Sequence, residues 1–89
     1  MIHRKIKIVN KLGLHARAAA KFATEASRFM SNISVGTNGK SVNAKSVMSL
    51  MLLAASQGTD LDISADGEDE QAAIEAIATL IQNRFGEDQ

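Results

Sequence analysis

His15 and Arg17 are the residues of this sequence whose types and spacing best suit chemistry. His15 follows a glycine-containing loop and directly precedes a helix predicted to start at Ala16. The first N–H groups of a helix have no partner inside it, and with the macrodipole they attract an anion. Arg17 adds a permanent positive charge whose planar fork matches a phosphate. The junction therefore predicts a phosphate site in which the backbone N–H groups of Ala16, Arg17 and Ala18 bind the group.

The imidazole of His15 supplies the nucleophile for such a site. A neutral ring nitrogen can attack a phosphoryl group, and the positive field of a helix start should keep the ring neutral. An anion at a helix start is stabilised by about 0.3–1 kcal/mol, and by about 2 kcal/mol when it is partly buried. A site of this strength holds a phosphoryl group without trapping it, which suits a carrier. Taken by itself, the same position also fits a histidine that only caps the helix.

The composition argues against other kinds of site. The chain has no Cys, which excludes thiolate metal sites and cysteine nucleophiles. There is no glycine-rich phosphate loop, HExxH motif or calcium-loop spacing, and the acidic residues between Asp66 and Glu70 suit a solvated turn. We therefore expect no metal and no cofactor. A chain of 89 residues also has little room for an enclosed active site, so we expect a carrier and not an enzyme.

The charge balance argues against nucleic acid and membrane as partners. Ten basic and ten acidic residues cancel, and three Phe are the only aromatic residues. A neutral chain has no long-range attraction to polyanions, and few aromatic residues are available for bases to stack on. Met1 to Val9 mixes charged with apolar residues, unlike a signal peptide, and no apolar run approaches the ~20 residues that span a bilayer. We therefore expect a cytoplasmic protein.

Hydrophobic periodicity predicts seven elements in the order β-α-β-β-α-β-α. Apolar and polar residues alternate in the predicted strands, and apolar residues recur at helical spacing in the predicted helices. Asn38-Gly39 predicts a type I′ hairpin turn, because both residues tolerate a positive φ. The predicted strands are 2–9, 33–36, 40–43 and 60–65, and in the first of them Arg4 interrupts the alternation, which is clearest at 5–9. The predicted helices are 16–28, 47–54 and a last one that begins after residue 69.

Local signals mark the ends of the later elements. Ser46 is a favourable N-cap for helix 47–54, and Gly58 is placed to stop that helix in the left-handed conformation. Asp69 is expected to cap the last helix, with Glu70 in its first turn. The acidic C-terminal segment 86–89 is expected to fray.

The element order predicts an α+β fold class. Four short strands and three helices in a chain of this length indicate two layers, with the helices on one face of a mainly antiparallel four-stranded sheet. No linker, internal repeat or low-complexity segment interrupts the pattern. Residues 1–89 are therefore expected to form one domain.

The segment Gly13-Leu14-His15-Ala16-Arg17-Ala18-Ala19 resembles the active-site segment of the HPr family, the histidine-containing phosphocarriers of the bacterial sugar phosphotransferase system. The resemblance covers essentially the whole chain and implies an open-faced β-sandwich with three helices. It further implies that Nδ1 of His15 accepts a phosphoryl group from phospho-enzyme I, with Arg17 as the phosphate partner. The group then passes to a IIA protein or domain. Ala18 stands where the family commonly has Pro, a change that the first turn of a helix tolerates.

The segment Lys45-Ser46-Val47-Met48-Ser49-Leu50-Met51 resembles the family's second, regulatory segment. The resemblance implies that Ser46 is phosphorylated by a dedicated HPr kinase/phosphorylase, in organisms that have one. It also implies a partner-docking patch, in which thioether side chains adapt to several partners. The residues assigned to this patch are Ala16, Ala20, Val47, Met48 and Met51, with Leu50, Leu53 and Ala54 as core.

Two alternatives remain open beside a sugar-branch carrier. The resemblance does not separate it from the nitrogen-branch paralogue NPr, although the segment around Ser46 favours the regulated sugar branch. A module of the same fold that contacts a regulator without carrying phosphate is the other alternative, and the pairing of His15 with Arg17 argues against it. We expect a monomer in each case.

Overall fold

Four antiparallel strands form one sheet in the computed structural model, which describes all 89 residues. The strands are β1 (Ile2–Lys7), β2 (Asn32–Thr37), β3 (Lys40–Asn43) and β4 (Asp60–Asp66). They lie in the order β1-β4-β2-β3, and every neighbouring pair is antiparallel. This arrangement confirms the predicted sheet.

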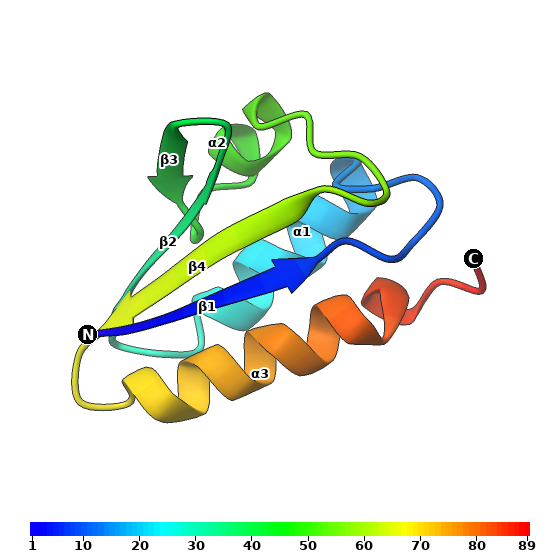
Figure 1. The fold of residues 1–89 in the computed structure, drawn as a ribbon. Helices are drawn as coiled ribbons and strands as arrows, with labels where there is room; N and C mark the ends of the chain where they lie inside the picture. The colour runs from blue at the N-terminus through cyan, green and yellow to red at the C-terminus, as the bar shows by residue number, and fades with distance from the viewer.

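Three helices cover one face of this sheet, as predicted (Figure 1). They are α1 (Ala16–Ala26), α2 (Val47–Leu52) and α3 (Glu70–Gln82), and a short 3₁₀ turn, η1 (Arg84–Gly86), follows α3. The helix α1 contacts both α2 and α3, while α3 also packs against β1 and β4. The structure is thus the expected two-layer α+β sandwich.

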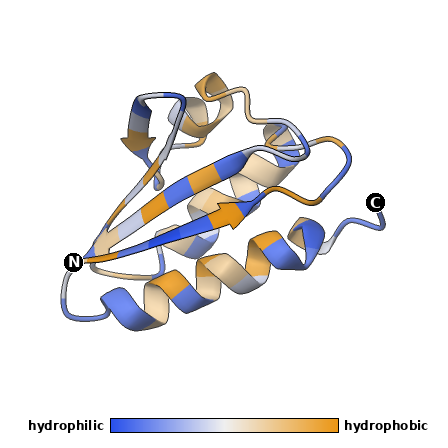
Figure 2. Ribbon diagram, in the orientation of Figure 1, coloured by the Kyte–Doolittle hydropathy of each residue, from blue (hydrophilic) through white to orange (hydrophobic).

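Alternate residues of the strands form the core between the two layers. In β4, Leu61, Ile63 and Ala65 are fully buried, while Asp62 between them is exposed and Ser64 is half-buried. Figure 2 shows this alternation of apolar and polar residues along β4. The C-terminal Phe85 is also fully buried, with its ring centroid 6.3 Å from that of Phe22 in α1. The end of the chain is therefore attached to the core.

The hairpin between β2 and β3 forms where the sequence predicts it. Asn38 and Gly39 have φ values of 52° and 81°, as a type I′ turn requires. The strand β3 has the predicted bounds. The strand β1 starts at Ile2 and ends at Lys7, two residues before its predicted end, because Ile8 leaves the ladder and exchanges hydrogen bonds with the turn before β4.

The prediction for the end of α2 was wrong. The helix ends at Leu52, and Ala54 takes the left-handed conformation directly after it, with φ of 51°. Gly58 also has a positive φ, of 89°, but it lies in a separate turn before β4. Ala54 is exposed, although it was expected in the core. Its backbone turn brings the buried Ala55 to the loop after β1, where the Ala55 carbonyl accepts a hydrogen bond from Leu14 N–H at 2.9 Å. A tertiary contact therefore sets this helix end. The helix α1 also ends earlier than predicted, at Ala26.

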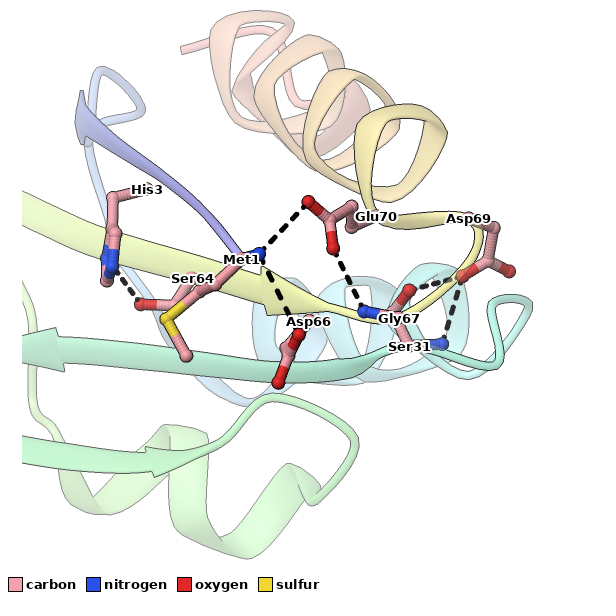
Figure 3. A network of polar contacts seen from close by, with 8 residues as sticks. All are labelled: Met1, His3, Ser31, Ser64, Asp66, Gly67, Asp69 and Glu70. Carbon is pink, nitrogen blue, oxygen red and sulfur yellow. Dashed lines mark hydrogen bonds and ion pairs between the residues drawn. The ribbon is translucent and has the colours of Figure 1, made fainter.

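The prediction that the Asp69 side chain caps α3 was also wrong. Asp69 occupies the N-cap position, but its carboxylate makes no cap hydrogen bond. It accepts a hydrogen bond from Met30 N–H at 2.9 Å. It also accepts hydrogen bonds from Ser31 N–H at 3.0 Å and from the Ser31 hydroxyl, as Figure 3 shows. The carboxylate therefore attaches the start of α3 to the segment between α1 and β2.

Candidate functional site

A tightly packed loop places His15 at the start of α1. Gly13 has φ of 67°, and a Cβ there would lie 2.5 Å from the Ala55 carbonyl oxygen and 2.8 Å from Ser56 Cα. Only glycine fits such an approach without displacing backbone. The side chain of Leu14 is buried next to it. The loop is therefore held against the segment after α2 immediately before His15.

His15 occupies the N-cap position of α1 in an extended conformation. Its carbonyl accepts the first helical hydrogen bond, from Ala19 N–H at 2.8 Å, but its ring makes no cap hydrogen bond. The side chain is 28% exposed. The ring therefore does not act as a cap, which leaves it available for chemistry.

The first turn of α1 offers the expected anion-binding groups. The backbone N–H groups of Ala16, Arg17 and Ala18 donate to no acceptor in the protein. The side chain of Arg17 is exposed and makes no ion pair. An open pocket beside them is lined by Lys11, Leu12, His15, Ala16, Arg17, Glu87 and Gln89. The predicted donors thus lie at one open site.

The C-terminal tail forms one side of this site, and the prediction that it frays was wrong for Glu87. The Glu87 side chain is only 14% exposed, and its Oε2 atom contacts Nε2 of His15. Its Oε1 atom accepts a hydrogen bond from the Asn10 amide at 3.0 Å, and the Gln89 carbonyl accepts one from Lys11 N–H at 3.1 Å. Figure 1 shows the C-terminus at the end of the molecule where the loop after β1 runs.

Asn10 connects the tail to the loop that carries His15. Its side chain is fully buried, and its amide also donates to the Gly13 carbonyl at 2.8 Å. Burial raises the pKa of the Glu87 carboxyl, but the hydrogen bonds from His15 and Asn10 outweigh it. With the nearby Lys21 ammonium they hold the pKa of Glu87 below its usual range. The site therefore places a carboxylate, not only positive groups, beside the His15 ring.

The predicted regulatory and docking residues lie on α2, next to α1. The Ser46 hydroxyl accepts a hydrogen bond from Ser49 N–H at 3.2 Å, which confirms Ser46 as the N-cap. Leu50 and Leu53 are buried, as predicted for the core. All residues of the predicted docking patch are exposed: Ala16, Ala20, Val47, Met48 and Met51. Leu52, which is 74% exposed, is a further exposed apolar side chain of α2.

Sequence reasoning missed the contributions of Asn10, Lys11 and Glu87. Glu87 lies 72 positions from His15, and nothing in the local pattern of either segment indicates their contact. The one signal near the tail is Phe85, an aromatic residue that a frayed end would expose. The structure contains no group of three or more metal-ligating side chains, and none of its helices has the length and apolar character needed to cross a bilayer.

Comparisons with known proteins agree with this geometry. A family model described as "PTS HPr component phosphorylation site" matches residues 2–83. The phosphocarrier protein HPr of Xylella fastidiosa is 52% identical over 88 residues, which cover 99% of both chains. A crystal structure of HPr from Thermoanaerobacter tengcongensis is 49% identical with a TM-score of 0.96 and covers all of both chains. A dimer of HPr from that organism is 50% identical, with a TM-score of 0.79 over 98% of this chain and 100% of the other.

The match is therefore full-length in sequence and in fold, and its family model is defined by a phosphorylation site. The chain belongs to the HPr family of phosphocarriers of the phosphotransferase system.

Proposed function

We propose that this chain accepts a phosphoryl group on His15 from phospho-enzyme I and passes it to a IIA protein or domain. As a member of the HPr family it is a phosphocarrier and not itself a catalyst. The proposal assigns the acceptor atom, the donor and the recipient. The observation that carries it is the placement of a partly exposed histidine ring beside three free N–H groups and the unpaired guanidinium of Arg17.

The chemistry that this arrangement supports is the direct transfer of a phosphoryl group from an atom of the donor protein to a ring nitrogen of His15. The lone pair of the His15 Nδ1 atom forms a bond to phosphorus while the bond between phosphorus and the donor breaks, and its electron pair stays with the donor. The N–H groups of α1 and Arg17 stabilise the charge of the phosphoryl oxygens. Because such a site stabilises an anion by only about 0.3–2 kcal/mol, transfer stays reversible.

Incubation with enzyme I and phosphoenolpyruvate tests the proposal. We expect intact mass to rise by one phosphoryl group, and peptide mapping to place an acid-labile phosphate on His15. Addition of a IIA protein should remove it. A protein whose mass does not change, or one phosphorylated elsewhere, would contradict the assignment.

Partner binding is proposed for the exposed apolar side chains of α1 and α2. Met48 is 73% exposed and Met51 is 43% exposed, and α2 lies next to α1, whose N-cap is His15. A flexible apolar surface beside the acceptor suits a carrier that meets several proteins in turn. The expectation of a monomer stays a prediction, since the related proteins of known structure include a dimer.

Regulation through Ser46 is a second part of the proposal. Ser46 lies at the start of α2, directly before the exposed Val47 and Met48. A phosphate there would carry about −1.5 to −2 charges, which must be desolvated when a partner docks. We therefore propose that modification of Ser46 weakens binding to enzyme I.

The variant Ser46→Asp should bind enzyme I more weakly while it remains folded. Asp is also a favourable N-cap, so the melting temperature should hold or rise slightly. Like-charge juxtaposition in an interface can cost several kcal/mol, and the loss should shrink as salt rises. The measurement is a titration with enzyme I at two ionic strengths. Ser41→Asp, which adds the same charge at an exposed position of β3, is the control. Equal affinities of the two variants would contradict the regulatory proposal.

A further inference from the structure

We propose that Glu87 is a positioning residue for His15, which accepts the Nε2–H of the ring and so leaves Nδ1 as the attacking nitrogen. This inference rests on the proposed phosphoryl transfer and deepens it. It adds the C-terminal tail to the machinery, as the group that decides which ring nitrogen reacts.

The tail is attached firmly enough to hold a side chain in place. Phe85 is fully buried against Phe22, and its carbonyl accepts a hydrogen bond from the Lys21 ammonium at 2.7 Å. Two residues later, Glu87 is bound by the Asn10 amide at 3.0 Å. Asn10 is itself buried and bonded to the Gly13 carbonyl at 2.8 Å, in the loop that carries His15. The carboxylate and the ring are thus positioned by the same buried amide.

The contact between Glu87 and His15 selects one tautomer of the ring. An ionised carboxylate only accepts hydrogen bonds, and the pKa of Glu87 lies below its usual range. The ring nitrogen that faces it, Nε2, must therefore carry a proton. In the neutral ring the lone pair is then on Nδ1, which becomes the nucleophile. A hydrogen bond at the far nitrogen orients a catalytic histidine in the same way in serine hydrolases.

The carboxylate also balances the charge that transfer creates. When Nδ1 of a neutral ring bonds to phosphorus and the donor bond breaks, the ring becomes a phosphorylated imidazolium that still has its Nε2 proton. No proton moves in this step. Glu87 stabilises the positive ring by a charge-assisted hydrogen bond. Reverse transfer restores the neutral ring, so the same pair serves the uptake and the release of the group.

Other charged groups near Glu87 have separate roles. Lys11, Arg17 and the end of the chain at Gln89 line the same pocket, and Lys21 contributes favourable charge from α1. Arg17 is exposed without an ion pair, so it is free to meet the phosphate. Glu87 is bound to the ring. The site therefore separates the group that holds the phosphate from the group that holds the nucleophile.

The test compares Glu87→Gln with Asp88→Asn, which removes the same charge from the neighbouring residue. Asp88 is exposed and makes no hydrogen bond or ion pair. The first measurement is ¹⁵N NMR of the ring nitrogens of unphosphorylated protein near neutral pH. We expect wild type and Asp88→Asn to protonate Nε2 of His15, and Glu87→Gln to increase the share protonated on Nδ1. The ring of His3 in the same sample should not change.

The second measurement is single-turnover phosphorylation by phospho-enzyme I. Glu87→Gln should react about ten-fold more slowly or worse, as expected for a lost charge-assisted hydrogen bond, and Asp88→Asn at the wild-type rate. Wild-type rates and tautomers in Glu87→Gln would overturn the proposal. If Glu87→Gln detaches the tail, then Glu87→Asp, which keeps the charge, must react faster than Glu87→Ala, and equal rates would overturn it. The NMR measurement needs no enzyme I. A wild type that takes up no phosphate would contradict the proposed function alone.

Discussion

Carboxylates form hydrogen bonds at both ends of the molecule, but the two ends differ in what the carboxylates bind. At one end lies an N-terminal cluster, shown in Figure 3, which consists of Met1, Ser31, Gly67, Asp69 and Glu70. There Asp69 accepts three hydrogen bonds from Met30 and Ser31. Glu70 accepts one from Gly67 N–H at 3.1 Å, and its other oxygen lies 3.2 Å from the N-terminal ammonium. Every partner of these carboxylates is a backbone, hydroxyl or ammonium donor.

At the other end, Glu87 binds the ring of His15 and the amide of Asn10. One of its partners is thus the proposed nucleophile, and the side chains of Lys11 and Arg17 line the same pocket and add positive charge. The two ends teach that a network of carboxylate hydrogen bonds is not by itself a functional site. The difference lies in whether a reactive group and an unpaired cation are part of it.

The largest expected difference between the ends concerns their histidines. His15→Ala should fold normally but take up no phosphoryl group, because the proposed acceptor is gone. His3→Ala should take up phosphate like wild type, although His3 also makes a hydrogen bond, to the Ser64 hydroxyl at 3.0 Å. Intact mass after incubation with enzyme I and phosphoenolpyruvate measures both. Acid-labile phosphate on His15→Ala would show that His15 is not the acceptor.

Two arginines near opposite ends of α1 provide the next comparison. Arg17→Ala should slow transfer by ten-fold or more, because a charge-assisted phosphate contact contributes about 1.5–3 kcal/mol. Arg28→Ala should leave the rate unchanged, since Arg28 lies after the opposite end of α1 and pairs with Glu25 at 2.7 Å. Rapid-quench kinetics with phospho-enzyme I measure both. Equal rates for the two variants would remove Arg17 from the site.

Two glycines test whether packing at each end supports function or only stability. A Cβ on Gly13 would lie 2.5 Å from the Ala55 carbonyl, and a Cβ on Gly67 would lie 2.6 Å from the Ser31 hydroxyl. Either Ala variant should lose about 1–3 kcal/mol of stability, because backbone or a bonded side chain must shift. Only Gly13→Ala should also slow transfer, since it displaces the loop before His15. Denaturant unfolding and transfer kinetics on the same samples separate the two effects. A wild-type transfer rate in Gly13→Ala would show that the loop does not position His15.

Most of the fold was predictable because its signals are local. Asn38-Gly39 needs no distant partner to form its turn, and the bounds of β3 follow from it. The alternation in β4 likewise requires only that one face of the sheet be covered. The C-terminal end of α2 and the role of Asp69 were not predictable in this way, because residues far along the chain decide them. Ala55 meets Leu14, and Asp69 meets Ser31 across 38 positions.

The candidate site divides along the same line. His15 and Arg17 lie two positions apart at one loop–helix junction, so their types and spacing were enough to propose the candidate site. Glu87 reaches this junction only because Phe85 is buried against α1 and Asn10 is buried beneath the loop. Neither residue has a local pattern that reports its partner. A short acidic tail is therefore predicted to fray from its sequence, and only its tertiary contacts show that it is held in place.

The smallest expected difference between the ends is their contribution to stability as pH falls. Hydrogen bonds from Ser31 and Met30 hold the pKa of Asp69 below its usual value, so its stabilisation is present above that value and is lost as pH falls through the lowered one. The wild-type melting temperature should therefore decrease below about pH 4, the ordinary pKa of an aspartate.

Asp69→Asn should melt several degrees lower than wild type at pH 7, and this difference in melting temperature should narrow toward pH 3. Glu87→Gln should show a smaller gap, because Glu87 binds only the side chains of Asn10 and His15, whereas Asp69 joins α3 to the segment before β2. Thermal unfolding by circular dichroism between pH 3 and 7 measures this, with Asp88→Asn expected to follow wild type. If Glu87→Gln lowered the melting temperature more than Asp69→Asn did, the C-terminal tail would be a main support of the fold, and the contrast between a structural end and a chemical end would fail.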